Sequence, residues 1–373
     1  MNSVETKTET KTGTENIIVP SGVFEKENQL MVRLEDVAIL RQDLKFQNYI
    51  EAPPVSKAAL YGRACTSDSV TIDSWASQWL NQIKENAKHF DFKKMSIIKE
   101  HGKHALKPCI IAGSGSSLKI NYKELKDKGD IPLISCLHNF GLFEDAGIKV
   151  DYYLNLDAGD ITIPEMTEAG KQDQEFYWER TKNLKLATTI LGNPALLKKW
   201  RGEILFFNTI APDPVFLKDL TDITDFNLVF NTGGNALGAC LYMAKAILGC
   251  NPICFVGADF SFGYNKKFHA WDSNYDNQFT GLMPATDVFG NRVWTWASYF
   301  NFKCWFDYIA LGGKGNNPGT YINCTEGGIF GAYPDGNIRA VTQMSLHQFL
   351  CEYNLYKILP DLLKDKKQYN YLF

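Results

Sequence analysis

The chain has 373 residues, of which 45% are hydrophobic and 22% are charged, and its formal net charge at pH 7 is −3. This composition is that of a globular protein long enough to bury a full α/β core, and it excludes a disordered or fibrous chain. Because the charge balance is slightly acidic, there is no basic field to attract nucleic acid or an anionic membrane, and neither is expected as a partner.

The first 16 residues are expected to lie outside the fold. They are rich in Thr, Lys and Glu without apolar periodicity, which predicts a disordered tail. We recognise no targeting signal, and no apolar run reaches the roughly 18 residues that span a bilayer. The nine cysteines have no Cys-x-x-Cys spacing, which suits a reducing compartment. We therefore expect a cytoplasmic protein without a transmembrane segment.

Residues 17–105 are predicted to form an N-terminal accessory region. The clearest helical signal in this region is the spacing of Trp75, Trp79, Leu80 and Ile83. We interpret the two tryptophans as packing anchors onto the domain that follows.

The main domain is predicted over residues 106–340, where short apolar runs alternate with helix-like segments. Short strands that are apolar on both faces belong in a buried parallel sheet, and right-handed crossovers give a doubly wound arrangement. The prediction is a Rossmann-like α/β fold with a mostly parallel sheet, helices on both faces and a C-terminal helical segment over 341–373. The expected strands are 109–112, 132–136, 152–156, 184–190, 203–207 and 252–256, and the expected crossover helices are 122–128, 140–146, 194–200 and 236–248.

A glycine-serine turn follows the first of these strands. Its glycines would let the backbone approach a ligand, while N–H groups and serine hydroxyls could hold phosphate oxygens. The turn lacks the third glycine of the dinucleotide fingerprint and the lysine of a P-loop, so an ordinary strand-to-helix turn is the alternative. The predicted phosphate-binding residues of this turn are Gly113, Ser114, Gly115, Ser116 and Ser117.

Other polar residues are expected at the same edge of the sheet, where ligands of such folds bind. Asn155 and Asp157 end one strand, and Asp157 could bind Mg²⁺ or a ribose hydroxyl or could cap a helix. Asp259 ends another strand in the same way. Gly233 and Gly234 precede a helix and offer a second anion site, or they allow close helix packing.

Two later segments complete the set of candidates. His269 follows Asp259 in a polar, aromatic loop and could act as a general base, although most loop histidines have no chemical role. Thr325, Glu326 and Gly327 follow an apolar run and indicate either a substrate loop or a tight turn.

The order of these motifs resembles a superfamily of motility accessory factors that glycosylate flagellin, archaeal 6-hydroxymethylpterin diphosphokinase-like proteins and, more distantly, bacterial lipooligosaccharide sialyltransferases. The resemblance covers about residues 108–331. It rests on the segment from Ile110 to Leu118, on residues 147–152 leading to Asp157, on residues 233–260, and on residues 325–328.

The resemblance implies roles for these residues. In sialyltransferase-like relatives the glycine turn and the segment matching Asn155–Asp157 bind a cytidine-monophosphate sugar, and a histidine that matches His269 deprotonates the acceptor hydroxyl. No metal would be obligatory for that reaction. In the pterin diphosphokinase relatives the same fold transfers diphosphate from ATP, and Mg²⁺ would be held by Asp157 or Asp259.

The leading prediction is a glycosyltransferase that uses a nucleotide-activated sugar, such as a nonulosonate, with His269 and Asp259 as catalytic residues. The second is a Mg²⁺-dependent diphosphokinase that uses ATP, and the third is a non-catalytic nucleotide-binding protein. The acceptor would be a glycan, a protein or a pterin-like alcohol, and the oligomeric state stays open, a homo-oligomer included.

Overall fold

The structure is a computed structural model that describes residues 46–64, 68–209, 214–226, 228–262, 269–271, 280–313 and 319–353. From Phe46 onward the chain forms one compact unit. The predicted tail 1–16 and the first part of the predicted accessory region, residues 17–45, lie outside the described residues. No helix in the described ranges is long and apolar enough to cross a membrane.

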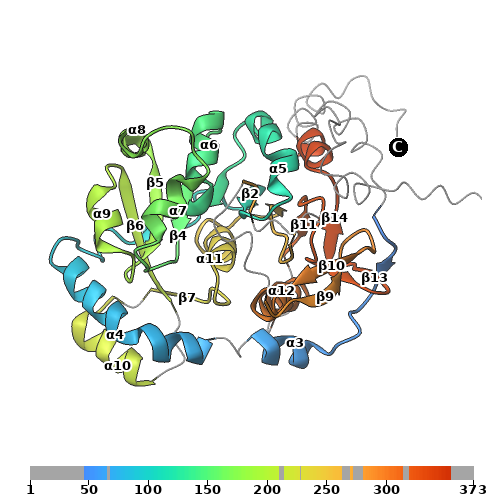
Figure 1. Cartoon of the computed structure of the whole chain (residues 1–373), viewed down its shortest axis with the longest axis horizontal. Coiled ribbons are helices and arrows are strands. Elements are labelled where there is room, and N and C mark those ends of the chain that lie inside the picture. Colours follow the sequence, from blue (N-terminus) through green and yellow to red (C-terminus); the bar gives the residue numbers. More distant parts are fainter. Residues whose placement is uncertain are drawn as a thin grey trace, which may run out of the picture. The chain divides into compact units, whose positions relative to one another are not determined.

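Nine strands form a central sheet in which every neighbouring pair is parallel (Figure 1). Their spatial order is β14-β11-β8-β2-β3-β4-β5-β6-β7. This confirms the predicted α/β fold and its parallel sheet. The strands are β2 (Cys109–Ala112), β3 (Leu133–Cys136), β4 (Tyr152–Asn155), β5 (Lys185–Thr189), β6 (Glu203–Thr209), β7 (Val229–Phe230), β8 (Ile253–Val256), β11 (Tyr321–Asn323) and β14 (Val341–Gln343).

Both faces of the sheet are covered, which explains why its strands are apolar at successive positions. In β2, Ile110 and Ala112 belong to one buried cluster, whereas Cys109 and Ile111 belong to another. Since successive side chains of a strand point to opposite faces, these two clusters are the cores on the two sides of the sheet. The molecule therefore has three layers, with helices on each side of the sheet.

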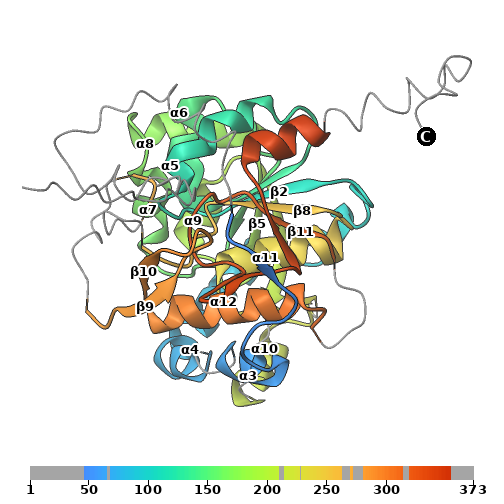
Figure 2. The ribbon, with the colours of Figure 1, turned by 90° about the vertical axis from the view of Figure 1, so that its right-hand side faces the viewer.

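The helices divide between the two cores, and Figure 2 shows α5 and α6 on one side of the sheet with α11 and α12 on the other. The first core takes side chains from α4 (Asp68–Ala87), α5 (Leu118–Asn121), α6 (Phe140–Ala146), α7 (Thr162–Glu168), α8 (Gln174–Arg180), α9 (Pro194–Lys199) and α10 (Pro214–Ile223). The second takes them from α3 (Lys57–Ala64), α11 (Ala236–Tyr242) with its π-helical extension η6 (Met243–Ile247), and α12 (Ala297–Ala310). Short 3-10 helices are η2 (Ile97–Glu100), η3 (Tyr122–Asp127), η4 (Leu137–Asn139) and η5 (Thr181–Asn183).

Local sequence fixes several helix ends. Asn193 caps α9, because its side chain accepts hydrogen bonds from the N–H groups of Ala195 and Leu196, and Pro194 occupies the first turn. Helix α6 ends at Gly147, whose φ of 66° lies in the left-handed region that glycine adopts without strain. These signals let the crossovers stay short and keep the strands in register.

Two small sheets lie outside the nine-stranded one. One joins β1 (Tyr49–Ile50), β13 (Gly336–Ile338) and β12 (Ala332–Tyr333), and the other is the antiparallel pair β9 (Met283–Thr286) and β10 (Arg292–Thr295). Because β1 pairs with β13 and Ile83 of α4 is buried in the first core, residues 46–105 are integrated into the compact unit. The boundary at residue 105 stays a prediction.

The C-terminal segment differs in part from the prediction of a helix over 341–373. Residues 341–343 form strand β14, which pairs with β11 in parallel register. A helix begins at Leu346 and continues to Tyr353, where the described residues end. Val341 and Gln343 are buried while Thr342 is exposed, so the alternation is that of a strand at the sheet edge.

The chain reverses its direction of travel across the sheet between β2 and β8. From β2 it runs outward through β3 to β7, and it then returns to β8 on the other side of β2. Parallel sheets bind ligands beyond the carboxyl ends of the strands at such a switch point. The glycine turn follows β2 and Asp259 follows β8, so the fold brings these two predicted elements together.

Candidate functional site

The glycine turn continues the pairing between β2 and β8. The Gly113 N–H donates to the carbonyl of Val256 at 2.9 Å, and the Gly115 N–H donates to the carbonyl of Gly257 at 3.0 Å. A Cβ atom on Gly113 would lie 2.4 Å from the Gly257 oxygen, which is closer than real Cβ contacts. Glycine is therefore required because two backbones meet here, and two of the expected phosphate donors are already used.

The Asp259 carboxylate lies where the sequence analysis expected a bound phosphate. Its Oδ2 accepts hydrogen bonds from the Ser117 N–H at 2.9 Å and the Ser116 hydroxyl at 3.2 Å, and its Oδ1 accepts one from the Ser117 hydroxyl. Burial raises the pKa of Asp259, and the bonds from Ser117 and Ser116 act in the opposite direction. The carboxylate thus holds the turn at the start of α5. In this structure the Ser116 and Ser117 hydroxyls face Asp259, and their binding of a phosphate stays a prediction.

A cavity of about 890 Å³ opens beside this turn. Its described walls come from the carboxyl ends of β2, β3, β4 and β8, from the start of α11, and from α4, α7, α10 and α12. The predicted site residues that line it are Gly113, Ser114, Gly115, Asn155, Asp157, Gly233, Gly234, Asp259 and His269. Residues far apart in the sequence are therefore gathered at the switch point, as the fold requires.

His269 is fixed against the glycine turn. Its backbone forms an isolated antiparallel bridge with Gly115, and its Nδ1 lies 3.1 Å from the carbonyl oxygen of Ser114. Its ring stacks on Trp271 with centroids 4.8 Å apart. Burial lowers the pKa of His269 to about 4, and the charge of His138 adds to this effect. The imidazole is therefore neutral at pH 7.

His138 and Glu165 form an ion pair in the same cavity that the sequence did not reveal. His138 lies in η4, directly after β3, and its Nε2 is 2.8 Å from Oε2 of Glu165 on α7. Burial lowers the pKa of His138, but the hydrogen bond and charge of Glu165 outweigh burial, so the pKa lies above its ordinary value. The one sequence feature that could have indicated a site role for His138 is its position just after a predicted strand.

Asn155 and Asp157 lie at the end of β4, as predicted. Asn155 is buried, and its amide donates to the Asp157 carbonyl at 2.8 Å and to the Thr188 hydroxyl at 3.3 Å. Asp157 is exposed, and its Oδ1 accepts the Gly159 N–H at 2.8 Å. Asp157 therefore presents a carboxylate to the cavity, while Asn155 fixes the backbone that carries it.

Gly233 and Gly234 form the turn before α11, with φ values of 60° and 77°. A Cβ atom on Gly233 would lie 2.4 Å from the Trp305 side chain, so close packing also requires glycine there. The Asn235 side chain caps α11 by accepting the Gly238 N–H at 2.8 Å. The close contact with Trp305 supports the packing interpretation of Gly233, and the anion site stays a prediction for a turn that lines the cavity.

The family of the chain follows from comparison with known proteins. Residues 77–265, which include every strand from β2 to β8, match the family model described as 6-hydroxymethylpterin diphosphokinase MptE-like. The chain belongs to the MptE-like family. No curated protein matches it. Among solved structures it is similar to the MAf glycosyltransferase from Magnetospirillum magneticum AMB-1, with 13% identity and a TM-score of 0.48, over 75% of this chain and 42% of that one.

Three predicted substrate residues of this MptE-like protein do not line the cavity. Thr325 is buried and its hydroxyl accepts the Ala258 N–H at 3.0 Å. Glu326 is also buried, and its Oε1 accepts bonds from the Asn121 amide at 3.2 Å and the Leu346 N–H at 2.9 Å. Gly327 lies behind Ser117. Thr325 therefore holds the backbone after β8, and Glu326 joins α5 to the helix that begins at Leu346. The substrate role of these residues stays a prediction, because they lie outside the cavity that gathers the other candidates.

Aromatic side chains form one wall of the cavity. Trp79 packs with its edge toward Phe216, with ring centroids 5.9 Å apart, as expected of a packing anchor. Trp75 is 47% exposed and lines the cavity, so the same interpretation is wrong for this residue. An exposed indole at a cavity wall can stack on a sugar or a base.

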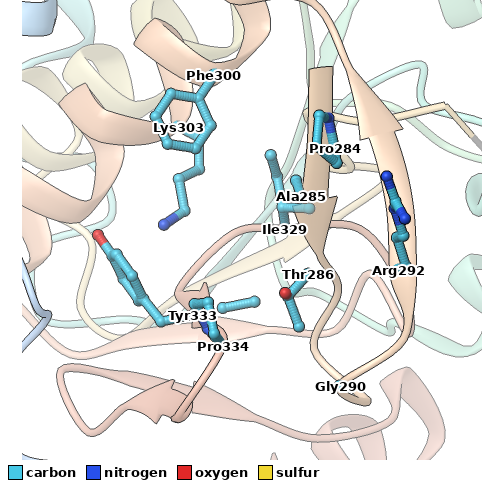
Figure 3. Close-up of a pocket in the computed structure, with 11 residues that line it drawn as sticks. Pro284, Ala285, Thr286, Gly290, Arg292, Phe300, Lys303, Ile329, Tyr333 and Pro334 are labelled. Carbon is cyan, nitrogen blue, oxygen red and sulfur yellow. The ribbon is translucent and has the colours of Figure 1, made fainter. Parts of the chain in front are cut away.

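The MptE-like chain has a second, smaller cavity of about 460 Å³ between α12 and the β9–β10 pair (Figure 3). None of the predicted site residues lines it. The Lys303 ammonium lies over the Tyr333 ring at 3.4 Å and pairs with Asp307 at 2.6 Å, and both charged side chains are buried. Asp307 also accepts the Tyr333 hydroxyl at 2.7 Å. This cluster joins α12 to β12 and satisfies its own charges, as a structural ion pair does.

The metal-binding capacity of the site is small. In the ranges that the structure describes, no three His, Cys, Asp or Glu side chains come together as metal ligands. Asp157, the exposed carboxylate at the cavity, fits a Mg²⁺ ion whose remaining ligands are phosphate oxygens and water, because Mg²⁺ is often bound by one or two carboxylates plus a substrate. Asp259 does not fit this role, because serine donors occupy both of its oxygens.

Proposed function

We propose that this MptE-like protein is a transferase that moves a sugar from a nucleotide-activated donor to the hydroxyl group of an acceptor. The observation that carries the proposal is the position of His269, a neutral imidazole fixed at the wall of the cavity of about 890 Å³. The family match supports a transferase in general, since its description is that of a diphosphokinase.

His269 is suited to accept a proton. Its Nδ1 faces the Ser114 carbonyl, which can only accept, so the proton of the neutral ring lies on Nδ1. Nε2 therefore carries the lone pair. A pKa of about 4 keeps the ring neutral and Nε2 unprotonated at pH 7, although it also makes the imidazole a weaker base than one whose pKa lies near 7.

The charges around the cavity favour a donor with a single phosphate. The described lining residues include no lysine or arginine, and their carboxylates are Asp157, Glu165 and Asp259. ATP carries about four negative charges and would need a metal ion to enter such a site. A nucleoside monophosphate sugar carries one negative charge on its phosphate, and a nonulosonate adds one carboxylate, so such a donor carries fewer negative charges than ATP. Backbone N–H groups, the amides near α11 and the His138 ring are the described groups that can bind them.

In the proposed reaction the acceptor oxygen attacks the anomeric carbon of the sugar. The bond between that carbon and the phosphate oxygen breaks, and the nucleoside monophosphate leaves with the bonding electrons. Nε2 of His269 takes the proton of the attacking hydroxyl, so no free alkoxide forms. The donor sugar is a nonulosonate in this proposal, and the acceptor is a glycan or a protein.

A second candidate function is transfer of diphosphate from ATP to a pterin-like alcohol, which the description of the family favours. In that reaction the hydroxyl oxygen attacks the β-phosphorus and AMP leaves, again with His269 as the base. Mg²⁺ would neutralise the phosphate oxygens, and Asp157 is the side chain that would hold it.

The experiment that tests these functions measures nucleotide release. The protein is incubated with CMP-, UDP- and GDP-activated sugars and a mixed acceptor pool, or with ATP and a hydroxymethylpterin, each with Mg²⁺ or with chelator. We expect CMP release that is unchanged by chelator. His269→Gln should slow it by about 10²- to 10⁴-fold, as expected for a lost general base.

His89→Gln is the matched control, because His89 is an exposed histidine paired with Glu85 outside the cavity. Activity that requires ATP and Mg²⁺ would replace the glycosyltransferase proposal with the diphosphokinase. Nucleotide binding without any turnover would contradict both and favour a non-catalytic nucleotide-binding protein.

A further inference from the structure

His138 is held rigidly at the cavity wall. Its neighbour Asn139 is buried, and the Asn139 amide donates to the Gly113 carbonyl at 3.0 Å, to the Ala112 carbonyl at 3.3 Å and to the Ser135 hydroxyl at 3.1 Å. These bonds tie η4 to β2, to β3 and to the glycine turn. His138 therefore keeps a fixed position relative to the turn.

Glu165 orients the His138 ring. The pair is 2.8 Å apart, and the side chains are 31% and 14% exposed, so solvent screens it less than a surface pair. An imidazolium has two N–H donors. Nε2 is directed to Glu165, which leaves Nδ1 as the donor that can reach a ligand in the cavity.

His138 and His269 are neighbours whose pKa values are shifted in opposite directions. Their ring centroids are 5.9 Å apart and their planes are nearly perpendicular. Burial lowers the pKa of both rings, but Glu165 raises that of His138 above its ordinary value, whereas that of His269 falls to about 4. His138 therefore takes up a proton at a higher pH than His269 does. Two titratable groups whose environments separate their pKa values are suited to different roles in one reaction.

The other charged groups around His138 support its cationic form. Glu165 on α7 acts on it directly, and Cys136 on β3 and Asp157 after β4 also raise its pKa. His269, from the facing loop, is neutral and does not oppose this charge. Since the described lining residues include no lysine or arginine, His138 is the described lining side chain that protonates most readily.

We propose that His138, oriented by Glu165, binds the phosphate group of the nucleotide donor through Nδ1–H and stabilises the negative charge that this group gains as it leaves. This inference rests on the proposed function and assigns the acceptor side to His269 and the leaving-group side to His138. The alternative is that the His138–Glu165 pair only fastens α7 to η4.

Histidine side-chain NMR of the wild-type protein tests the inference. Imidazole ¹⁵N shifts are followed from pH 5 to pH 9 for the free protein, with inorganic phosphate and with CMP. We expect either anion to raise the pKa of His138 by about one unit, because a nearby opposite charge favours the charged form. His104 contacts Tyr152, does not line the cavity and serves as the internal reference.

A binding comparison gives a second readout. CMP should bind the wild type at least about tenfold more tightly than cytidine, since a charge-assisted hydrogen bond contributes on the order of 1.5 kcal/mol or more. His138→Gln should reduce this ratio toward one, and Glu165→Gln should reduce it in part. His89→Gln changes the exposed His89–Glu85 pair and should leave the ratio unchanged.

The outcomes separate this inference from the proposed function. If nucleotides bind while the pKa of His138 does not move, the inference is overturned and the glycosyltransferase proposal survives. If phosphate raises the pKa of His138 but no nucleotide binds, the anion site stands and the glycosyltransferase proposal fails. If phosphate and CMP both leave the pKa of His138 unchanged, the pair is only a structural contact.

Discussion

At the scale of single residues, His269 makes the stability of the protein depend on pH. Its pKa is about 4 in the folded state and about 6.5 in an unfolded chain, so between these values only the unfolded state binds the proton. The free energy of unfolding should therefore fall as the pH falls from 6.5 to 4. Between pH 7 and pH 5 the loss from this residue should be up to about 2 kcal/mol.

Urea unfolding of the wild type and of His269→Gln at pH 7, 6 and 5 measures the contribution of His269 to the pH dependence of stability. The variant should lose less stability than the wild type on acidification, because glutamine does not titrate. His138 contributes in the opposite sense in both proteins, since its raised pKa gives stability below pH 6.5 that is lost as pH rises through the folded pKa. An identical pH dependence in the two proteins would contradict the burial of His269.

The two aspartates at the sheet edge should respond differently to the same substitution. Asp259→Asn places an amide where Ser116 and Ser117 donate, and the lost charge-assisted bonds should cost about 2 to 4 kcal/mol. Asp157→Asn changes an exposed carboxylate with one turn bond and should cost less than about 1 kcal/mol. Chemical unfolding at pH 7 measures the free energy of unfolding of both variants. Equal losses in the two variants would contradict the role of Asp259 in holding the glycine turn.

At the scale of secondary-structure elements, the Lys303–Asp307 pair within α12 contacts Tyr333 and so fastens α12 to β12. Lys303→Met would leave Asp307 as a buried charge with the Tyr333 hydroxyl and the Gly331 N–H as its donors, at a cost of about 3 to 5 kcal/mol. Lys94→Met is the matched control, because Lys94 is an exposed lysine paired with Asp91. A loss for Lys303→Met no greater than for the control would show that the pair is not a structural support.

Strands can be predicted well from the sequence where burial on both faces produces a continuous apolar run. Six strands of the central sheet were predicted from apolar runs, because a strand buried on both faces is apolar at every position. The edge strands β7 and β14 and the neighbouring β11 have two or three residues each, which is too short for such a pattern. Thr325 and Glu326 show the other limit, since their polarity suggested a ligand while in the structure their side chains accept backbone N–H groups of Ala258 and Leu346.

At the scale of the whole molecule, the site exists because the topology gathers separate strand ends. The position of the glycine turn, Asp157 and Asp259 at one sheet edge follows from parallel strands alone, and it was predictable. The His138–Glu165 pair was not, because it depends on how α7 lies against η4. Likewise, the hydrogen bond from Ser117 to Asp259 depends on the pairing of β2 with β8, so it could not be predicted from the sequence.

Thermal stabilisation by nucleotides is the most direct test that this cavity binds an activated nucleotide. The melting temperature is measured with CMP, CDP, UDP, GDP, ADP and ATP, each with and without Mg²⁺, because a ligand at about 100 times its Kd stabilises the folded state by about 2.7 kcal/mol. We predict that CMP raises the melting temperature without Mg²⁺. If no nucleotide raises it under either condition, the cavity at the β2–β8 switch point is not a nucleotide site and the proposed function is wrong.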